Sequence, residues 1–309
     1  MIDGAKLKNE LQLLHGVKEV AVDEPMSRHT SIGIGGKVDV FVVPASVEEL
    51  KRTLAYFDER KIPCMPVGNC TNLIVRDGGY RGALISLQGL QGVEIEDKGA
   101  EASLLYAEAG VALGRMVDLS VEHSLGGLEF CAGIPGSFGG ALWMNAGAYG
   151  GEMKDIVTTL FLLEPHRQIK AVARERLQFE YRRLDLPEGT IITGARVQLT
   201  RRPSDVIRRR VDEIRALRKS KHPLTLRSAG SVFKNPPGNP AGKLIEEAGL
   251  KGFRTGDAQV SEMHGNFIVN RGKARAGDIL ELIDVIREKV KKRTGILLET
   301  EVKIIGDGI

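Results

Sequence analysis

GGLEFCAGIPGSFGGALWMNAGAYGG, residues 126–151, is the segment of the 309-residue chain that carries the most information. It holds nine glycines in 26 residues, and part of it reads G-x-x-G-x-x-G-G, at Gly133, Gly136, Gly139 and Gly140. Glycines let a backbone approach a ligand closely, and concave arrays of backbone amides bind phosphate groups. From composition alone, a tight turn leading into a buried helix is an equally good interpretation.

A second loop strengthens the ligand interpretation. The segment PVGNCTNLIVRDGGYRG (66–82) follows a predicted strand, and small or polar residues stand where that strand ends: Gly68, Asn69, Thr71 and Asn72. No G-x-G-x-x-G lies between a strand and a helix, and no P-loop motif is present, so neither a Rossmann site nor a P-loop is supported. Two separate amide-rich loops suit one long, diphosphate-bearing cofactor better than two unrelated turns.

Composition indicates a globular chain of two or three domains, with 42% hydrophobic and 27% charged residues. No apolar run approaches the ~18 residues of a membrane span, and the first residues lack a signal-peptide core, so a cytoplasmic protein without a membrane partner is expected. Cys64, Cys70 and Cys131 form no C-x-x-C, and the six histidines are scattered. Neither a disulfide framework nor a metal site is therefore expected.

Positive charge gathers in residues 201–221, where nine Lys/Arg face three Asp/Glu. Three interpretations remain open for this segment. It could bind nucleic acid, although no aromatic residues are interleaved for base stacking. It could be the solvated face of a helix, or it could contact a small anion such as a nucleotide diphosphate.

Hydrophobic patterns divide the chain into three units: 1–80, 81–200 and 201–309. The first contains strand 37–44, a helix capped by Ser46, and strand 61–68, a βαβ-like arrangement. The second contains a helix near 113–123 and several strands: 82–87, 92–97, 102–110, 155–165, 168–174, 177–183 and 190–200. The third begins with a helix whose apolar positions are Ile207, Val211, Ile214 and Leu217.

The third unit also contains a helix that ends near Gly295 and a final strand, 296–306. Alternation along that strand places Glu299 and Glu301 on the same face, away from the apolar residues.

The loop AGSVFKNPPGNP (229–240) raises a separate question, because Ser231 has no neighbouring histidine in the sequence. Ser231 could be a nucleophile, a phosphate ligand, a proton donor or an ordinary turn residue. Its surroundings alone favour a turn serine that bonds the local backbone.

In seven blocks, the sequence resembles the UDP-N-acetylenolpyruvoylglucosamine reductase (UDP-N-acetylmuramate dehydrogenase) family, in its shorter type without an extra helical insertion. The blocks follow the family's order over nearly the whole chain: RHTSIGIGGKVD, VGNCTNLIV, GLEFCAGIPGSFGGALWMNAGAYGGE, FEYRR, KHPLTLRSAGSVFKNPPGNPAGKLIEEAGLKG, VSEMHGNFIVN and ETEVKIIG. The resemblance implies an α+β fold. A two-part FAD-binding module of the vanillyl-alcohol-oxidase type (1–80 and 81–200) would precede a C-terminal α/β substrate domain (201–309).

FAD would lie between the first two units with its pyrophosphate on backbone amides. The resemblance implies these cofactor-binding residues: Gly68, Asn69, Thr71, Asn72, Gly133, Ile134, Pro135, Gly136, Ser137, Gly139, Gly140, Asn145 and Gly147. One position departs from the family, because Cys70 replaces a glycine of its G-x-G-S-N loop. If that position has a positive φ, Cys70 is strained or the loop is reshaped.

The implied reaction serves peptidoglycan synthesis and thus cell-wall formation, cell shape and division. NADPH reduces FAD, and the flavin N5 then passes a hydride to C3 of UDP-N-acetylglucosamine enolpyruvate, which yields UDP-N-acetylmuramate. Ser231 matches the family's proton donor to C2, Arg182 the arginine at the substrate carboxylate, and Glu301 the catalytic glutamate. We expect a raised pKa for Glu301. Arg183, on the other face of a predicted strand, and Glu299 are the competing neighbours.

Substrate contacts are expected from Lys221, Lys234, Asn235 and Tyr149, in a protein that is a monomer and binds no nucleic acid. Two rival functions remain open at this point. One is an alcohol oxidase on the same flavin fold, and the other is a nucleotide- or RNA-binding protein built around residues 201–221.

Overall fold

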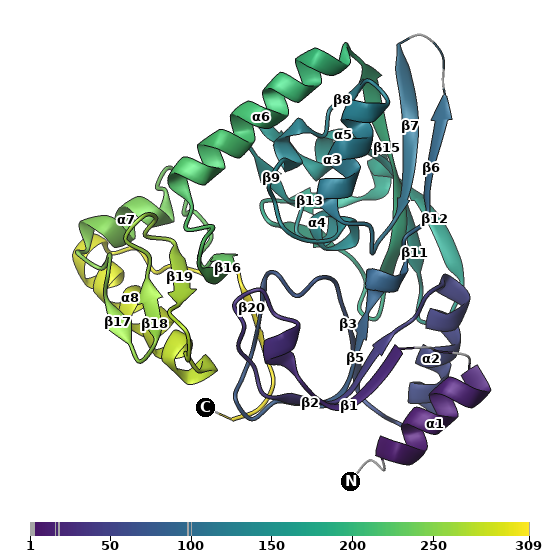
Figure 1. Cartoon of the computed structure of the whole chain (residues 1–309), viewed down its shortest axis with the longest axis horizontal. Helices are drawn as coiled ribbons and strands as arrows, with labels where there is room; N and C mark the ends of the chain where they lie inside the picture. The colour runs from purple at the N-terminus through teal and green to yellow at the C-terminus, as the bar shows by residue number, and fades with distance from the viewer. Residues whose placement is uncertain (1–3, 16, 18, 98, 100, 309) are drawn as a thin grey trace.

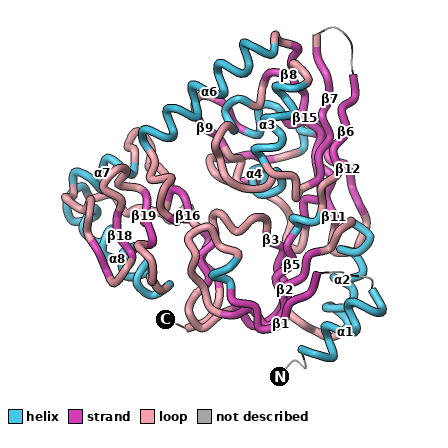
Figure 2. The backbone as a smooth tube through the Cα atoms, in the orientation of Figure 1, coloured by secondary structure: helices cyan, strands magenta, loops and turns pink. Residues whose placement is uncertain are grey.

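The computed structural model describes residues 4–15, 17, 19–97, 99 and 101–308, which form three lobes (Figure 1). Figure 2 shows that each lobe combines strands with helices and that long loops lie between the lobes. The helices are α1 (Gly4–His15), α2 (Val47–Glu59), α3 (Leu113–Glu122), α4 (Phe138–Trp143), α5 (Met153–Ile156), α6 (Ser204–Lys221), α7 (Ala241–Glu247) and α8 (Ala276–Thr294). No helix in the described part of the chain is long and apolar enough to cross a membrane.

The first sheet has the order β1-β2-β5-β3, with bounds β1 (Glu19–Pro25), β2 (Lys37–Val43), β3 (Cys64–Val67) and β5 (Tyr80–Ser86). Both β2 and β3 run parallel to β5, so the predicted βαβ unit is present with a further strand between its two strands. Ser46 caps α2 as predicted, since its side chain accepts from the Glu49 amide at 3.2 Å. The predicted boundary at residue 80 falls where β5 begins, and the domain boundaries stay a prediction.

The second sheet is antiparallel, and its path is β12-β11-β15-β7-β6. Its strands are β6 (Val93–Asp97), β7 (Ala102–Glu108), β11 (Val157–Leu163), β12 (Ile169–Ala173) and β15 (Ile191–Arg201), and β8 (Leu125–Gly126) also pairs with β15. The glycine-rich segment packs on one face of this sheet, where Phe138 and Leu142 of α4 are fully buried in the same core as Leu105 and Val197.

The predicted strand 177–183 is wrong. It is a hairpin of β13 (Gln178–Glu180) and β14 (Arg183–Asp185), with a two-residue turn at Tyr181 and Arg182. Arg182 has φ +57°, a left-handed conformation that no strand adopts. A smaller hairpin, β9 (Gly147–Ala148) and β10 (Gly151–Glu152), stands beside it.

The third lobe packs α7 and α8 against an antiparallel sheet of order β16-β19-β18-β17. Its strands are β16 (Arg227–Ser231), β17 (Arg254–Thr255), β18 (Ala258–Val260) and β19 (Phe267–Asn270). Helix α6 runs from the second lobe to the third (Figure 1). On α6 the prediction fails at one turn: Leu217 is 38% exposed, and the next residue, Arg218, is buried instead.

The predicted final strand, 296–306, is also wrong. Only β20 (Lys303–Ile305) is a strand, and it pairs in parallel with β4 (Leu73–Val75), which directly follows the first loop. Before it, Thr300 forms an isolated bridge with Phe233. The C-terminal segment therefore runs between the first and third lobes, as Figure 1 shows for β20.

Candidate active site

The two amide-rich loops meet in the structure. The Thr71 hydroxyl donates to the Pro135 carbonyl at 3.3 Å, which joins the loops directly. A Cβ added at Gly68 would lie 2.5 Å from the Ser137 hydroxyl oxygen, so the two loops approach closely here. The loops 68–72 and 133–137, which adjoin different sheets, are therefore in direct contact.

Two polar atoms on this surface lack partners inside the protein. The Asn69 Oδ1 and Ser137 Oγ atoms are buried, and neither has a hydrogen-bond partner among the described residues. A buried polar atom without a partner carries a desolvation cost of about 1–3 kcal/mol, so a bound ligand with polar groups would relieve it. The two loops therefore fit FAD, whose diphosphate and ribityl groups supply such partners.

Not every predicted cofactor residue offers its amide. The amides of Ile134 and Gly139 donate to the carbonyls of Cys131 and Ala109, so these residues give the loop its shape. A Cβ added at Gly140 would lie 3.4 Å from Ser137 Oγ, so Gly140 lies close to that hydroxyl group. Gly136 has φ +137°, a backbone conformation that residues with a side chain rarely adopt. The side chain of Asn145 is fully buried, and both ends of its amide bond to the protein, so we assign that side chain to holding the loop.

Cys70 has φ +50°, so the position where the family has glycine does require a left-handed conformation. The loop keeps its place: Ser31 donates from its amide to the Cys70 carbonyl at 3.3 Å. The thiol is buried, and burial raises the Cys70 pKa to about 12, which keeps the thiol protonated and unreactive. Cys70 is therefore a strained structural residue.

Glu301 is held between the first loop and the Ser231 loop. The Asn72 side chain donates to the Glu301 carbonyl at 3.0 Å, and the Glu301 amide donates to the Val232 carbonyl at 2.8 Å. These two backbone contacts fix the carboxyl group beside β16, although residues 296–302 form no strand.

Arg182 reaches the same place from the hairpin turn. Its Nε lies 3.3 Å from Glu301 Oε1, and its Nη2 donates to the Gly147 carbonyl at 3.0 Å. Burial raises the pKa of Glu301 above the ordinary carboxyl value, although Arg182 and Lys234 oppose the shift. The predicted direction is confirmed, and the physical cause is desolvation outweighing two nearby positive charges.

Ser231 ends β16 opposite Phe267, one residue before the carbonyl that anchors Glu301. No hydrogen bond joins its hydroxyl to another described side chain or backbone group. Of the two competing carboxylates, Glu299 is 72% exposed and pairs with Lys234 at 2.5 Å, whereas Glu301 is 18% exposed. Likewise Arg183 is exposed and pairs with Asp185. Arg182 therefore contacts Glu301, whose backbone is anchored at the residue that follows Ser231.

The substrate contacts of Lys221, Lys234, Asn235 and Tyr149 stay a prediction. Asn235 is exposed, but its side-chain oxygen accepts from the Ala241 amide at 2.9 Å, which leaves its NH2 group for a ligand. Lys221 is exposed at the end of α6. Tyr149 occupies the β9–β10 turn with φ +51°.

Sequence reasoning missed two positioning residues. The Tyr181 hydroxyl accepts from the Asn235 amide at 3.3 Å, which ties the Arg182 turn to the Ser231 loop. The Ser31 hydroxyl contacts the carbonyls of Thr71 (3.2 Å) and Ser228 (2.7 Å), which ties the first loop to β16. Both residues lie inside sequence blocks that carry the family resemblance, and that resemblance was the signal that could have identified them.

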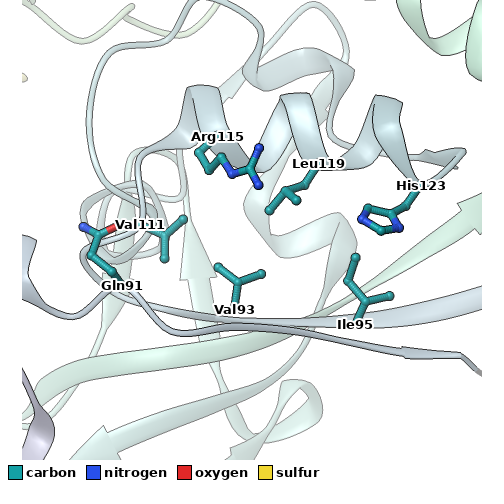
Figure 3. Close-up of a pocket in the computed structure, with 7 residues that line it drawn as sticks. All are labelled: Gln91, Val93, Ile95, Val111, Arg115, Leu119 and His123. Atoms are coloured by element: carbon teal, nitrogen blue, oxygen red, sulfur yellow. The ribbon is translucent and has the colours of Figure 1, made fainter.

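A separate groove lies between α3 and β6 (Figure 3). Arg115 and Leu119 of the helix, and His123 directly after its end, face Val93 and Ile95 of the strand. None of the predicted cofactor or substrate residues lines it. In the described part of the chain, no cluster of His, Cys, Asp or Glu could hold a metal ion.

Comparisons with known proteins agree with this geometry. An FAD-binding domain family matches residues 38–166, and the C-terminal domain family of UDP-N-acetylenolpyruvoylglucosamine reductase matches residues 222–305. Together with the two loops, these matches define the chain as an FAD-dependent oxidoreductase of the predicted α+β class, in which an FAD-binding module is followed by a C-terminal domain.

Relatives named UDP-N-acetylenolpyruvoylglucosamine reductase identify the family. The one from Syntrophus aciditrophicus is 51% identical over 93% of this chain and 92% of its own. That from Caldanaerobacter subterraneus is 44% identical over 93% of each. A crystal structure of the Thermus caldophilus reductase superposes with a TM-score of 0.78 at 37% identity, covering 93% of this chain and 98% of its own. The chain belongs to the UDP-N-acetylenolpyruvoylglucosamine reductase family.

Proposed function

We propose that the protein uses NADPH to reduce UDP-N-acetylglucosamine enolpyruvate to UDP-N-acetylmuramate, a precursor of peptidoglycan. The observation that carries the proposal is the convergence of Ser231, Arg182 and Glu301 from three distant parts of the chain. NADPH over NADH as donor, a monomeric state and a cytoplasmic location stay predictions.

The residues of the two loops, 68–72 and 133–137, would hold FAD. When bound, FAD supplies hydride transfer from the nicotinamide donor to C3 of the enolpyruvyl group. The chain itself must then bind the substrate, offset charge and deliver a proton.

Arg182 would face the substrate carboxylate. As negative charge develops on C2 and the carboxylate, a guanidinium held in place by Glu301 and the Gly147 carbonyl offsets it without reorganising. A preorganised group of this kind contributes about 3–4 kcal/mol to the transition state. Burial raises the pKa of Glu301, and in its protonated form the carboxyl group would donate a hydrogen bond to that same carboxylate.

Ser231 would deliver the proton to C2. An alcohol is a weak acid, but a carbanion is a strong base, so the hydroxyl needs no activating partner. The absence of a described partner for this hydroxyl supports the role of acid, because a nucleophilic serine requires a neighbouring base.

The test separates the two half-reactions by stopped-flow absorbance of the flavin. We expect Ser231→Ala to leave reduction by NADPH nearly unchanged and to slow reoxidation by the enolpyruvyl substrate at least ~10²-fold. Ser228→Ala, in the same strand, is the matched control and should change neither rate. Equal losses in both half-reactions would show that Ser231 is structural, and a protein without bound flavin would contradict the function as a whole.

A further inference from the structure

We propose that Asn266 is a positioning residue for the proton-transfer step: it fixes the backbone that directly follows Ser231, and through it the places of Ser231 and Glu301. Asn266 is 4% exposed and stands one residue before β19. It touches neither the Ser231 hydroxyl nor the Glu301 carboxyl group, so it would act through the backbone alone. The inference rests on the proposed function, because it gives Asn266 a part in delivering the proton.

The side chain of Asn266 bonds at both ends to one backbone residue. Its Oδ1 accepts from the Phe233 amide at 2.9 Å, and its Nδ2 donates to the Phe233 carbonyl at 2.8 Å. The main-chain carbonyl of Asn266 also accepts from the Val232 amide at 2.9 Å. Three buried hydrogen bonds from Asn266 therefore hold the two residues that follow Ser231, and a buried amide satisfied at both ends keeps one orientation.

The sheet explains why an amide side chain is needed at this point. Ser231, the last residue of β16, pairs with Phe267, the first residue of β19. Beyond this pair the chain turns, because the Phe267 amide donates to the His264 carbonyl at 3.0 Å. A carboxamide carries the same donor and acceptor as a peptide group, so Asn266 continues the ladder past the end of β19. The pairing of β16 also has a register shift between Ser228 and Ser231, so regular pairing alone does not fix Ser231.

The other side of the same backbone segment carries Glu301. The Glu301 amide donates to the Val232 carbonyl at 2.8 Å, and the Lys234 amide donates to the Glu299 carbonyl at 2.9 Å. The segment that follows Ser231 thus has Asn266 on one side and the Glu301 segment on the other. A shift of this segment would displace the proposed proton donor and the catalytic carboxyl group together.

Asn266→Ala removes both side-chain bonds to Phe233 and frees the segment to shift. A misplacement of about 1 Å in a reacting group costs on the order of 10²-fold in rate. In stopped-flow measurements we expect flavin reoxidation by the enolpyruvyl substrate to slow at least ~10-fold, and reduction by NADPH to change less than about twofold. Reoxidation should also slow more in D2O than it does in the wild type, because proton delivery becomes the slow event.

Asn270→Ala is the matched control, because Asn270 is a buried asparagine of the same strand. Its side chain donates to the Ile32 carbonyl at 3.0 Å and accepts from the amides of Gly272 (2.8 Å) and Ala274 (3.1 Å). We expect this variant to lose thermal stability as Asn266→Ala does, but to change neither the reoxidation rate nor its isotope effect by more than about twofold. Equal slowing of reoxidation in the two variants would show that Asn266 acts only through stability.

Asn266→Asp tests the donor separately. An ionised carboxylate cannot donate to the Phe233 carbonyl, whereas a protonated carboxyl group offers both a donor and an acceptor. We expect the reoxidation rate of this variant, divided by that of the wild type at the same pH, to rise at least ~3-fold between about pH 8 and about pH 5. The division removes the titration of groups that both proteins share, such as Glu301 and His264, whose Nδ1 accepts from the Asn266 amide at 3.2 Å.

Wild-type reoxidation by Asn266→Ala, or equal slowing of both half-reactions, overturns the proposal. If Asn266→Ala does not fold, Asn266→Asp decides: a relative rate that rises on acidification supports the positioning role, and one that stays low at both pH values overturns it. The proposed function fails separately, if the enolpyruvyl substrate does not reoxidise the reduced flavin of the wild type.

Discussion

Glu301 shows how one side chain can be tuned by opposing effects. Its carboxyl group lies 3.3 Å from the Arg182 guanidinium and also interacts electrostatically with Lys234. Both positive charges lower the pKa of Glu301. Burial works in the other direction and is the larger effect, so the pKa is raised from the model-compound value of 4.5. The same burial that raises the pKa of Glu301 also makes ionisation of its carboxyl group destabilising.

The stability of the protein should therefore depend on pH through Glu301. A raised pKa in the folded state means that the protonated form is preferred there, so this contribution is present below about pH 4.5 and is lost as pH rises through the folded-state pKa. Glu301→Gln does not titrate. We expect the free energy of unfolding of the wild type to fall relative to Glu301→Gln as pH rises above about 4.5, as measured by urea denaturation. A constant difference across that range would contradict the raised pKa.

Cys70 permits a test of backbone strain. A non-glycine residue in the left-handed region costs about 1–2 kcal/mol, and Cys70 has φ +50°. Its buried thiol contributes packing that both Ala and Gly remove. We expect Cys70→Gly to be more stable than Cys70→Ala by about 1 kcal/mol in denaturant unfolding, the reverse of the usual order. If Cys70→Ala is the more stable variant, the loop relaxes and holds no strain.

At the scale of elements, local patterns predicted helices α2, α3, α6 and α8 and strands β2, β3, β5, β6, β7, β11, β12 and β15. They missed α1, α7, β1 and the sheet of the third lobe, and they failed where tertiary contacts override them. The alternating segment 177–183 contains no Gly, Pro, Asn or Asp that would indicate a turn, yet Arg182 adopts a left-handed conformation. Its side chain is held there by Glu301 and Gly147, which the local sequence does not contain. In 296–302, alternation reflects the burial of Leu298 and Val302 in a segment that pairs with no strand.

Asn145 links the elements that place Arg182. Its side-chain NH2 donates to the Glu152 carboxylate (2.7 Å) and to the Glu180 carbonyl (2.9 Å), and its oxygen accepts from the Lys154 amide (3.0 Å). Asn145→Ala removes all three hydrogen bonds and takes this partner from the part-buried Glu180 carbonyl and Lys154 amide, so we expect a loss of about 2–3 kcal/mol in the free energy of unfolding, measured by urea denaturation. Flavin reoxidation by the substrate should also slow, because the Arg182 turn loses its anchor.

The control for this element is Asn239→Ala, an exposed asparagine whose side chain bonds only to the nearby Pro237 carbonyl. It should change stability by less than about 0.5 kcal/mol. If Asn145→Ala instead binds FAD more weakly while its free energy of unfolding is unchanged, Asn145 is a cofactor-binding residue, as the resemblance implied.

At the scale of the whole molecule, the site exists only because distant segments meet. Asn72 and Glu301 are 229 positions apart, and the contact between them joins the first lobe to the end of the chain. Periodicity and turn signals extend over a few residues and carry no information about such contacts. The glycine loops, the Ser231 loop and the FEYRR block could each be recognised locally. Their convergence was available only through the resemblance to a family.

Because the two FAD loops belong to different sheets, the cofactor should act as a link between lobes. FAD at 100 times its dissociation constant adds about 2.7 kcal/mol to the stability of the state that binds it. We expect hydrogen exchange to show this protection mainly in residues 68–72 and 133–140. Strands β17 and β18 lie on the outer side of the third lobe (Figure 1) and should gain less. Riboflavin, which has the same ring system without the diphosphate, is the control and should protect neither loop to the same degree. Equal protection of β17 and β18, or equal protection by riboflavin, would show that FAD does not bridge the two loops through its diphosphate.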